Sequence, residues 1–310
     1  MLNMFRIVIF LVLVFSIPNY LYAQDVVLYG AAAQSCSTGT NPGAGESLLY
    51  LVNPDTGDME PIGATGFDGV TGLEFLPDGR LIGTARQGVD AGVLIQINPA
   101  TGQGTLIGVL GSFNNPNECG RFPDLAYDNA TDTLYATGSN CDNLSRAIFT
   151  IDPDTAEATL IGETGFGGGG LGLAMRSDGT LFHSRLSGDD LSFYTINLNT
   201  GAGTLIGTID ANIPPVPRLN VNSMDFHPIT GQLFGSSKEA DAPGPSYLVS
   251  INENLPSVSL VGQGVDCFDA LVFATKPEPI PALSTWGIMA VVVAFAVAGI
   301  FYIRKRRAVA

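Results

Sequence analysis

The chain is poor in the residue types on which most catalytic and metal-binding sites depend. Its 310 residues include only 2 histidines, and no two of its 4 cysteines form a Cys-x-x-Cys pair. This spacing disfavours zinc, and we expect no metal site. Basic residues are also scarce, since 14 Lys and Arg stand against 29 Asp and Glu, and Arg304–Arg307 form one basic cluster. An acidic body lacks the basic face that nucleic acid binding needs, so nucleic acid is disfavoured as a partner.

The N-terminal segment has the layout of a secretory signal peptide. Met1–Arg6 carries a basic charge, Ile7–Pro18 is apolar, and the small residue Ala23 precedes the expected cleavage site. We therefore expect residues 1–23 to be removed and the mature chain to begin near Gln24, outside the cytoplasm. In an oxidising compartment an even number of cysteines favours disulfides.

Two kinds of β-hairpin alternate along the rest of the chain. Hairpins such as "VLIQINPATGQGTLIG" begin at Leu48, Val93, Ala147, Ser192 and Tyr247. Between them lie "GLEFLPDGRLIGTA", "DLAYDNATDTLYAT", "GLAMRSDGTLFHS" and "SMDFHPITGQLFGS", whose turns use residues that tolerate tight or left-handed backbone. One hairpin of each kind gives a unit of four antiparallel strands, which we name A, B, C and D.

The four-strand unit predicts a β-propeller. It recurs roughly every 45 to 55 residues, the range of a propeller blade. The mature chain opens with "DVVLYGAAA", a B strand without an A strand, and the last hairpin is followed by "FDALVFAT", an A strand without a B strand. We therefore predict an all-β, five-bladed β-propeller over residues 24–275, closed by pairing of its N- and C-terminal strands, which leaves no open edge. Another closed or solenoid β architecture is the alternative.

The cysteines fall at equivalent corners of this register. Cys36 follows the first B strand and Cys267 precedes the last A strand, while Cys119 and Cys141 flank the third A/B pair. Since the start of A lies beside the end of B, we predict the disulfides Cys36–Cys267 and Cys119–Cys141. The first would clamp the closure and stabilise it by up to about 5 kcal/mol. Four buried thiols are the alternative.

The irregular connections gather on one face of such a propeller. The D-to-A and B-to-C connections form this loop face, and the short A-to-B and C-to-D turns form the opposite turn face. Loops on a rigid scaffold commonly bind ligands, and a cation, a sugar or a peptide would suit the polar groups near the axis. These candidates are Asp68, Glu118, Arg121, Asp124, Arg218, Asn220, Asn222, Asp266 and Asp269, together with His183. Solvated loop residues without a ligand are the simpler alternative.

The sequence indicates no catalytic residue and no cofactor. His227 lies in a turn, and His183 replaces the small residue of the other B strands, where a packed histidine is the simpler interpretation than a general base. Neither has a neighbouring nucleophile or a metal-ligand spacing. Glu74 and Asp225 occupy equivalent A-strand positions, which would suit the acid and base of a glycosidase. Matched positions in a repeat also have a structural explanation, so we regard this signal as weak.

Two resemblances add to these patterns. The "INPATG" and "LIG" hairpins over Val26–Thr275 resemble exported bacterial propellers of the WD-repeat-like, YVTN or NHL-like kind, an architecture that implies no fixed activity. The tail "IPALSTWG", followed by an apolar span and "RKRR", resembles the IPTL-CTERM sorting signal of Gram-negative bacteria. The matching residues are Ile280, Pro281, Leu283, Ser284, Trp286 and Gly287. Ala282 stands where Thr is usual, and Thr285 stands where an acidic residue is common.

The sorting signal implies export, transient retention in the inner membrane, and handling by a membrane-embedded sorting enzyme. The chain would then reach the cell surface or extracellular matrix. Residues 276–285 form the linker and sorting motif, and 286–303 form a transmembrane helix of about 18 residues, just sufficient to span a bilayer. The basic tail, 304–310, should stay cytoplasmic and leave the propeller outside.

We therefore expect an exported, surface-sorted propeller that acts as a binding, adhesion or extracellular-matrix module. Its partner would be an extracellular polymer or protein, and the absence of a catalytic set argues against an enzyme. The competing prediction is a secreted hydrolase or lyase acting on a sugar or lactone at the loop face. A structural surface protein without a small ligand is a third possibility.

Overall fold

The computed structural model describes residues 26–35, 44–87, 91–110, 122–139, 146–166, 172–239 and 245–275. Every helix or strand within these ranges is a β-strand, and all paired strands are antiparallel. The strands form one seven-stranded sheet and three four-stranded sheets. They all belong to one compact unit, Val26–Pro277.

The seven-stranded sheet contains, in spatial order, β19 (Phe268–Thr275), β1 (Val26–Ser35), β2 (Ala44–Val52), β3 (Met59–Phe75), β4 (Leu81–Gln87), β5 (Ala91–Ile97) and β6 (Gly104–Val109). The second sheet contains β7 (Asp124–Asp128), β8 (Thr133–Ser139), β9 (Arg146–Ile151) and β10 (Ala158–Glu163). The third contains β11 (Leu173–Met175), β12 (Leu181–Ser187), β13 (Asp190–Ile196) and β14 (Gly203–Asp210). The fourth contains β15 (Leu219–Phe226), β16 (Leu233–Glu239), β17 (Ser246–Asn252) and β18 (Ser257–Gln263).

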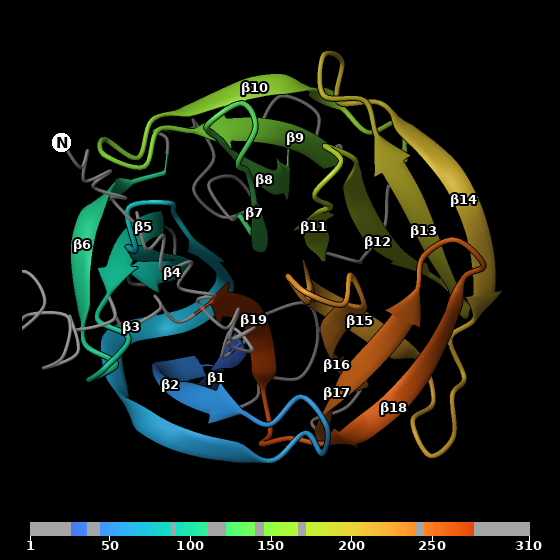
Figure 1. Cartoon of the computed structure of the whole chain (residues 1–310), viewed down its shortest axis with the longest axis horizontal. Coiled ribbons are helices and arrows are strands. Elements are labelled where there is room, and N and C mark those ends of the chain that lie inside the picture. Colours follow the sequence, from blue (N-terminus) through green and yellow to red (C-terminus); the bar gives the residue numbers. More distant parts are fainter. Residues whose placement is uncertain are drawn as a thin grey trace, which may run out of the picture. The chain divides into compact units, whose positions relative to one another are not determined.

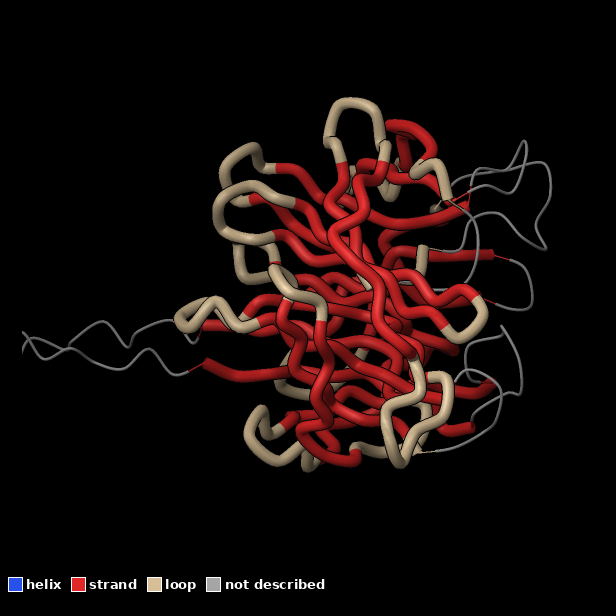
Figure 2. Tube along the Cα trace, turned by 90° about the vertical axis from the view of Figure 1, so that its right-hand side faces the viewer, coloured by secondary structure: helices blue, strands red, loops and turns tan. Residues whose placement is uncertain are grey.

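The sheets stand around a common axis, which makes the fold a β-propeller (Figure 1). Strands β7, β11, β15 and β19 lie innermost, whereas β6, β10, β14 and β18 lie at the rim (Figure 1). Several short turns project together on the left of Figure 2, at the turn face. The rim strands contain only exposed and half-buried residues, as in β6 and β10, because only one of their faces packs inward.

The long strand β3 takes part in two successive units. Its first half pairs with β2, from Val52↔Met59 to Leu48↔Ala64, and its second half pairs with β4 up to Phe75↔Leu81. The sequence predicted an irregular D-to-A connection here, and that prediction was wrong. Gly66 and Gly69 adopt φ values of 77° and 54°, which most residues avoid, so the backbone bends toward the axis without leaving the strand.

The two ends of the described chain pair with each other, as the sequence predicted. Strands β1 and β19 are hydrogen-bonded from Val26↔Thr275 to Ala32↔Phe268. Cys267, directly before β19, is buried and disulfide-bonded, and no described cysteine is free. Its predicted partner Cys36 lies outside the described residues, so this pairing stays a prediction.

The other predicted disulfide and both targeting segments also lie outside the described residues. This applies to Cys119 and Cys141, to residues 1–23 and to residues 276–310. Among the residues that are described, none belongs to a helix of the length and apolar character needed to cross a membrane.

Adjacent units meet at the glycine that follows the D-strand apolar residues, in "LIG" and in the related "PIG" and "LVG". Gly63 lies against the backbone oxygen of Thr101, and Gly162 lies against that of Thr200, with no room for a Cβ atom at either glycine. In the same way the D strand β18 meets the turn between β2 and β3, which joins the end of the chain to its beginning. Gly262 and Thr56 make that contact. The repeated glycine is therefore required by the close approach of neighbouring backbones rather than by its own turn.

Apolar side chains fill the spaces between neighbouring sheets. One cluster joins Tyr135 and Ile148 of the second sheet to Leu173 and Leu181 of the third. Another joins Leu28 of β1 to Leu248 of β17 and to β19. Each fully buried side chain of this size stabilises the fold by about 1.5–3 kcal/mol. The scaffold around the axis is thus fixed by packing on both sides of every inner and middle strand.

Candidate functional site

Four polar side chains meet on the loop face, near the axis. Asn220 and Asn222 lie near the start of β15, Lys238 lies near the end of β16, and Asp269 lies near the start of β19. We call these four residues the mouth cluster. Antiparallel pairing places the start of β15 beside the end of β16, with Asn220 opposite Lys238. The fold therefore gathers at one point residues that are up to 49 positions apart in the sequence.

Hydrogen bonds link the mouth cluster into a chain that ends on a carboxylate. Asn220 Nδ2 donates to Asn222 Oδ1 at 2.8 Å, and Asn222 Nδ2 donates to Asp269 Oδ1 at 2.9 Å. Lys238 Nζ donates to the same Asp269 oxygen at 3.1 Å. The side chains of Lys238 and Asp269 are 20% and 4% exposed, so this ion pair is largely shielded from solvent.

Two oxygen atoms of the mouth cluster are buried without a hydrogen-bond partner among the described residues. They are Oδ1 of Asn220 and Oδ2 of Asp269. Most buried polar atoms in proteins are hydrogen-bonded, and a buried acceptor without a donor costs about 1–3 kcal/mol. A bound molecule or water that donates hydrogen bonds at this point would remove that cost.

The mouth cluster contains two of the predicted ligand-binding residues, Asn222 and Asp269, and the further candidate Asn220. Lys238 was not among the residues predicted from the sequence. A signal for it exists, because Lys238 in "LFGSSKEA" aligns with Arg86 in "LIGTARQG", so two repeats end their B strand with a basic residue. Glu118 and Arg121 lie outside the described residues.

The remaining candidates on the loop face are either exposed or bonded to residues outside the mouth cluster. Asp68 and Asp266 are exposed. Arg218 has a φ of 50°, and its Nε donates to the backbone oxygen of Gly188 at 3.0 Å. It also lies 3.5 Å from the carboxylate of Asp189, so it fastens the turn between β12 and β13.

Asp124 lies in the interior and ties three inner strands together. One carboxylate oxygen accepts hydrogen bonds from the backbone N–H of Leu173 at 2.7 Å and of Met224 at 3.0 Å. The other oxygen accepts from the hydroxyl of Ser223 at 2.9 Å. Burial raises the pKa of Asp124 well above its ordinary value. These bonds join β7 to β11 and β15 and give Asp124 a structural role.

His183 is completely buried beside the inner strand β11. Its Nδ1 lies 2.9 Å from the backbone oxygen of Gly172, so Nδ1 carries the proton, and its ring stacks on Phe166 at 5.5 Å. Burial lowers the pKa of His183 to about 4, which keeps the imidazole neutral at pH 7. This environment matches a packed histidine.

Glu74 and Asp225 each accept a hydrogen bond from the inner strand of the next unit. The carboxylate of Glu74 accepts hydrogen bonds from the N–H groups of Phe75 and Tyr127, each at 2.9 Å. That of Asp225 accepts from Phe226 and Phe273, each at 2.7 Å. All four carboxylate oxygens therefore accept a backbone hydrogen bond, which is the structural explanation for the matched positions.

The two carboxylates also influence each other electrostatically. Burial raises the pKa of Asp225 to about 7. Burial is also the main cause that raises the pKa of Glu74 well above its ordinary value, and the charge of Asp225 raises it further. A carboxyl pair with raised pKa values is a feature that enzymes use for acid–base chemistry. It is the one observation that favours the enzyme prediction.

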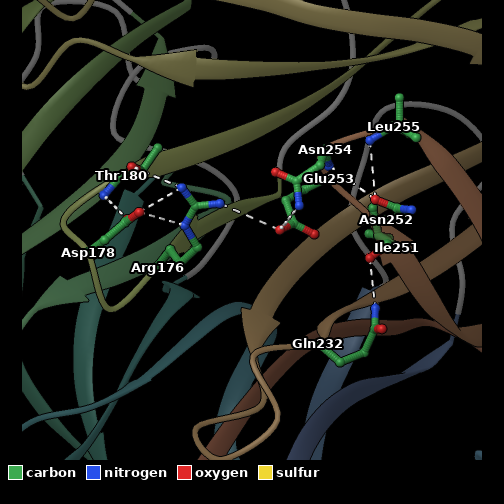
Figure 3. Close-up of polar contacts among 9 residues, drawn as sticks. All are labelled: Arg176, Asp178, Thr180, Gln232, Ile251, Asn252, Glu253, Asn254 and Leu255. Carbon is green, nitrogen blue, oxygen red and sulfur yellow. Dashed lines mark hydrogen bonds and ion pairs between the residues drawn. The ribbon is translucent and has the colours of Figure 1, made fainter.

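Polar groups on the turn face form bonds both within a sheet and between neighbouring sheets. Arg176 forms ion pairs with Asp178 at 2.7 Å and with Glu253 of the β17–β18 turn at 3.6 Å (Figure 3). Gln232 Nε2 donates to the backbone oxygen of Ile251 at 2.7 Å (Figure 3). These contacts support the prediction that the short turns are structural.

A groove of about 720 Å³ also opens on the turn face, beside the turns that follow β3 and β9. Arg80 lies in it and is bonded to Asp78 at 2.6 Å and to Asp154 at 2.8 Å. Tyr127 donates its hydroxyl to Asp132 in the same groove. Arg80 is thus paired with two of the five acidic side chains that line the groove. Within the described part of the chain, no three His, Cys, Asp or Glu side chains are arranged to hold a metal ion.

Comparison with known proteins yields similar structures but no family. No protein-family model matches the chain, and no curated protein matches it. The structure resembles a putative TolB from Agrobacterium tumefaciens (TM-score 0.47, 11% identity, covering 81% of this chain and 98% of that one). It also resembles the PQQ-bound aldose sugar dehydrogenase of Streptomyces coelicolor (TM-score 0.44, 12% identity, covering 75% of this chain and 85% of that one). A third similar structure is the periplasmic gluconolactonase of Pseudomonas aeruginosa (TM-score 0.40, 15% identity, covering 80% of this chain and 70% of that one).

Proposed function

We propose that this protein is an exported, surface-sorted β-propeller that acts as a binding or adhesion module through the mouth cluster. The observation that carries the proposal is the pair of buried acceptor atoms, Asn220 Oδ1 and Asp269 Oδ2, which have no donor among the described residues. Buried acceptors without a donor on a rigid scaffold are suited to a donor from a bound molecule that reaches them. The partner would be an extracellular polymer or protein.

The proposal includes a propeller of five blades. Strand β3 serves as the outer strand of one blade and the inner strand of the next, so the seven-stranded sheet counts as two blades. Five contacts between a D-strand glycine and the following C-to-D turn support the same number. The glycines are Gly63, Gly108, Gly162, Gly207 and Gly262, which face Thr101, Thr155, Thr200, Pro256 and Thr56.

The proposal also includes the route of the protein to the cell surface. Removal of residues 1–23 would release the chain outside the cytoplasm, where the predicted disulfides Cys36–Cys267 and Cys119–Cys141 would form. The tail with Ile280, Pro281, Leu283, Ser284, Trp286 and Gly287 would then be recognised by a membrane-embedded sorting enzyme. Helix 286–303 would hold the chain in the inner membrane until that step.

Binding by the whole protein, purified in detergent, tests the main proposal. The protein would be immobilised and exposed to purified cell-wall polymers, extracellular polysaccharides and matrix proteins. We expect at least one partner whose binding Asp269→Asn weakens about tenfold or more. Asp78→Asn, which alters a carboxylate of the turn face, is the matched control and should leave binding unchanged. Binding that Asp269→Asn leaves intact would place the site elsewhere.

A hydrolase or lyase acting on a sugar or lactone is the second candidate function. The electrostatic coupling of Glu74 and Asp225 favours it, because one carboxyl group of such a pair can stay protonated near neutral pH. Turnover of simple lactones and oligosaccharides by the whole protein tests this candidate. Turnover that Glu74→Gln and Asp225→Asn both abolish, without loss of folding, would favour the enzyme over the binding module.

A further inference from the structure

We infer that the mouth cluster recognises a neutral, polyhydroxylated ligand, a saccharide, by accepting hydrogen bonds from neighbouring hydroxyl groups. The inference rests on the proposed binding function and specifies the ligand class of that site. It is carried by three properties of the cluster: the direction of its hydrogen bonds, its balanced charge, and the burial of its two acceptors.

The direction of the hydrogen bonds follows from the carboxylate at one end. An ionised carboxylate only accepts hydrogen bonds, so Asn222 must turn its NH₂ group toward Asp269. The oxygen of Asn222 then faces Asn220, which must turn its own NH₂ group toward it. This order leaves Asn220 Oδ1 as an acceptor rather than a donor. Asp269 therefore fixes the chemical character of an atom two side chains away.

The free acceptors select a ligand that donates. Asn220 Oδ1 and Asp269 Oδ2 are both buried and both lack a partner among the described residues. A ligand that offers only acceptors would leave both atoms unsatisfied, and buried unsatisfied groups oppose binding strongly. Two neighbouring hydroxyl groups, or a hydroxyl and an amide N–H, supply the required donors.

The charge of the cluster favours a neutral ligand over an ion. Lys238 and Asp269 already neutralise each other across 3.1 Å. A cation would have to displace Lys238 from Asp269, and an anion would have to displace Asp269 from Lys238. A hydroxyl group needs neither exchange, because it donates its proton to one acceptor while its oxygen accepts a further N–H of Lys238. The Lys238 ammonium has three protons, of which the ion pair uses one.

Each residue of the cluster then has a distinct part in recognition. Asp269 would accept the stronger, charge-assisted hydrogen bond from the ligand. Asn220 would accept the second bond, and Asn222 would hold Asn220 in the accepting orientation without touching the ligand. Asn222 is therefore a positioning residue, and Asn220, Asp269 and Lys238 would contact the saccharide directly.

Titration calorimetry on the whole protein in detergent, against probes of three charge classes, tests the inference. The neutral probes are maltotriose, cellotriose and N,N′,N″-triacetylchitotriose, the cationic probe is spermidine, and the anionic probe is trigalacturonate. We expect at least one neutral probe to bind, with an affinity that changes less than about twofold between about 0.05 M and 0.5 M NaCl. Preferred binding of spermidine or trigalacturonate at low salt would overturn the ligand class.

Three variants test the assigned parts. Asn220→Ala and Asp269→Asn should each weaken the neutral probe about tenfold or more, because each removes an acceptor. Asp55→Asn, an exposed acid in the β2–β3 turn of the turn face, is the control and should have no effect. Unfolding midpoints measured alongside separate lost binding from lost folding.

The outcomes distinguish this inference from the proposed function. If a charged probe binds and Asp269→Asn weakens it, the binding module stands and the saccharide inference falls. If a neutral probe binds equally well to Asn220→Ala and Asp269→Asn, both the ligand contacts and the site are wrong. If none of the probes binds, the saccharide inference is rejected, while a matrix protein found in the broader screen would still support the binding module.

Discussion

Substitution of Asp124 separates the scaffold from the ligand site. Asp124→Ala removes the carboxylate that accepts the N–H groups of Leu173 and Met224 and the hydroxyl of Ser223. Those three donors belong to inner strands of neighbouring sheets, and Asp124 itself has no exposed surface. The variant leaves the two N–H groups without this acceptor, and the Ser223 hydroxyl keeps only the longer contact of 3.4 Å with the backbone oxygen of Leu271.

The expected loss of stability follows from the number of donors. A buried donor without a partner costs about 1–3 kcal/mol, and partial entry of water keeps each cost near the lower end, so the total is about 3–6 kcal/mol. A domain of this length changes its unfolding midpoint by about 2–4 °C for each kcal/mol, which predicts a decrease of roughly 10–20 °C. Asp124→Asn keeps one acceptor oxygen but turns an NH₂ group toward donors, so its effect should be intermediate.

Thermal unfolding followed by circular dichroism, together with a binding measurement below the midpoint, checks this prediction. Asp124→Ala should lower the midpoint yet bind like the unaltered protein while folded. Asp269→Asn should show a different pattern, with weakened binding and a smaller decrease of the midpoint, which arises because Lys238 loses its ion-pair partner. An Asp124→Ala variant that keeps its midpoint, or that loses binding while fully folded, would refute the structural role of Asp124.

Further predictions address the joints between blades, the axial carboxylates and the closure. Gly262→Ala should destabilise the fold by about 1–3 kcal/mol or more in urea unfolding. Gly207→Ala, whose Cβ would meet the nearest atom at 3.0 Å, should have a smaller effect, and equal effects would contradict the joint. Folding raises the pKa of Asp225 from 3.8 to about 7, so its contribution is fully present below about pH 4 and is lost as the pH rises through 7. The urea midpoint should therefore fall between about pH 4 and pH 7, and it should fall less in the Glu74→Gln/Asp225→Asn double variant, in which neither position can titrate. Cys267→Ser should lower stability by up to about 5 kcal/mol, and peptide mapping of the unreduced protein should identify Cys36 as the partner of Cys267.

The sequence predicted the fold well because its repeats carry the close contacts between backbones. Glycines such as Gly162 recur at the end of each "LIG" because a neighbouring turn leaves no space for a side chain. The closing strand was predictable for a similar reason, since the A strand at the C-terminus and the B strand at the N-terminus each lacked a partner. The continuity of β3 was not predictable, because Gly66 and Gly69 signal a loop as readily as a bend within a strand.

The candidate site was predicted less completely, because a shift of one residue reverses the direction of a side chain in a strand. Asp124 and Asp269 both begin an inner strand, and the sequence alone suggested the same role for both. The pairing of each inner strand with its neighbour shows that Asp124 is equivalent to Ser223 and Ala270 in the other units. These two residues directly follow Asn222 and Asp269, so Asp124 and Asp269 differ by one position in the repeat. Side chains at successive positions point to opposite faces, so Asp124 turns toward the other inner strands.

The acids near the axis divide according to what their oxygens bind. The oxygens of Asp124, Glu74 and Asp225 accept hydrogen bonds from the protein's own strands. Asp269 instead keeps one oxygen without a partner among the described residues. The repeat position that Asp269 occupies therefore differs in its role from the following position, which Asp124 occupies in its own unit. Substitutions there, at Thr71, Pro123, Asn222 and Asp269, would change the polar groups at the mouth, while the bonds that Asp124, Glu74 and Asp225 make between the inner strands would remain. We therefore expect such substitutions to alter binding at the proposed site more than they alter the closure of the propeller.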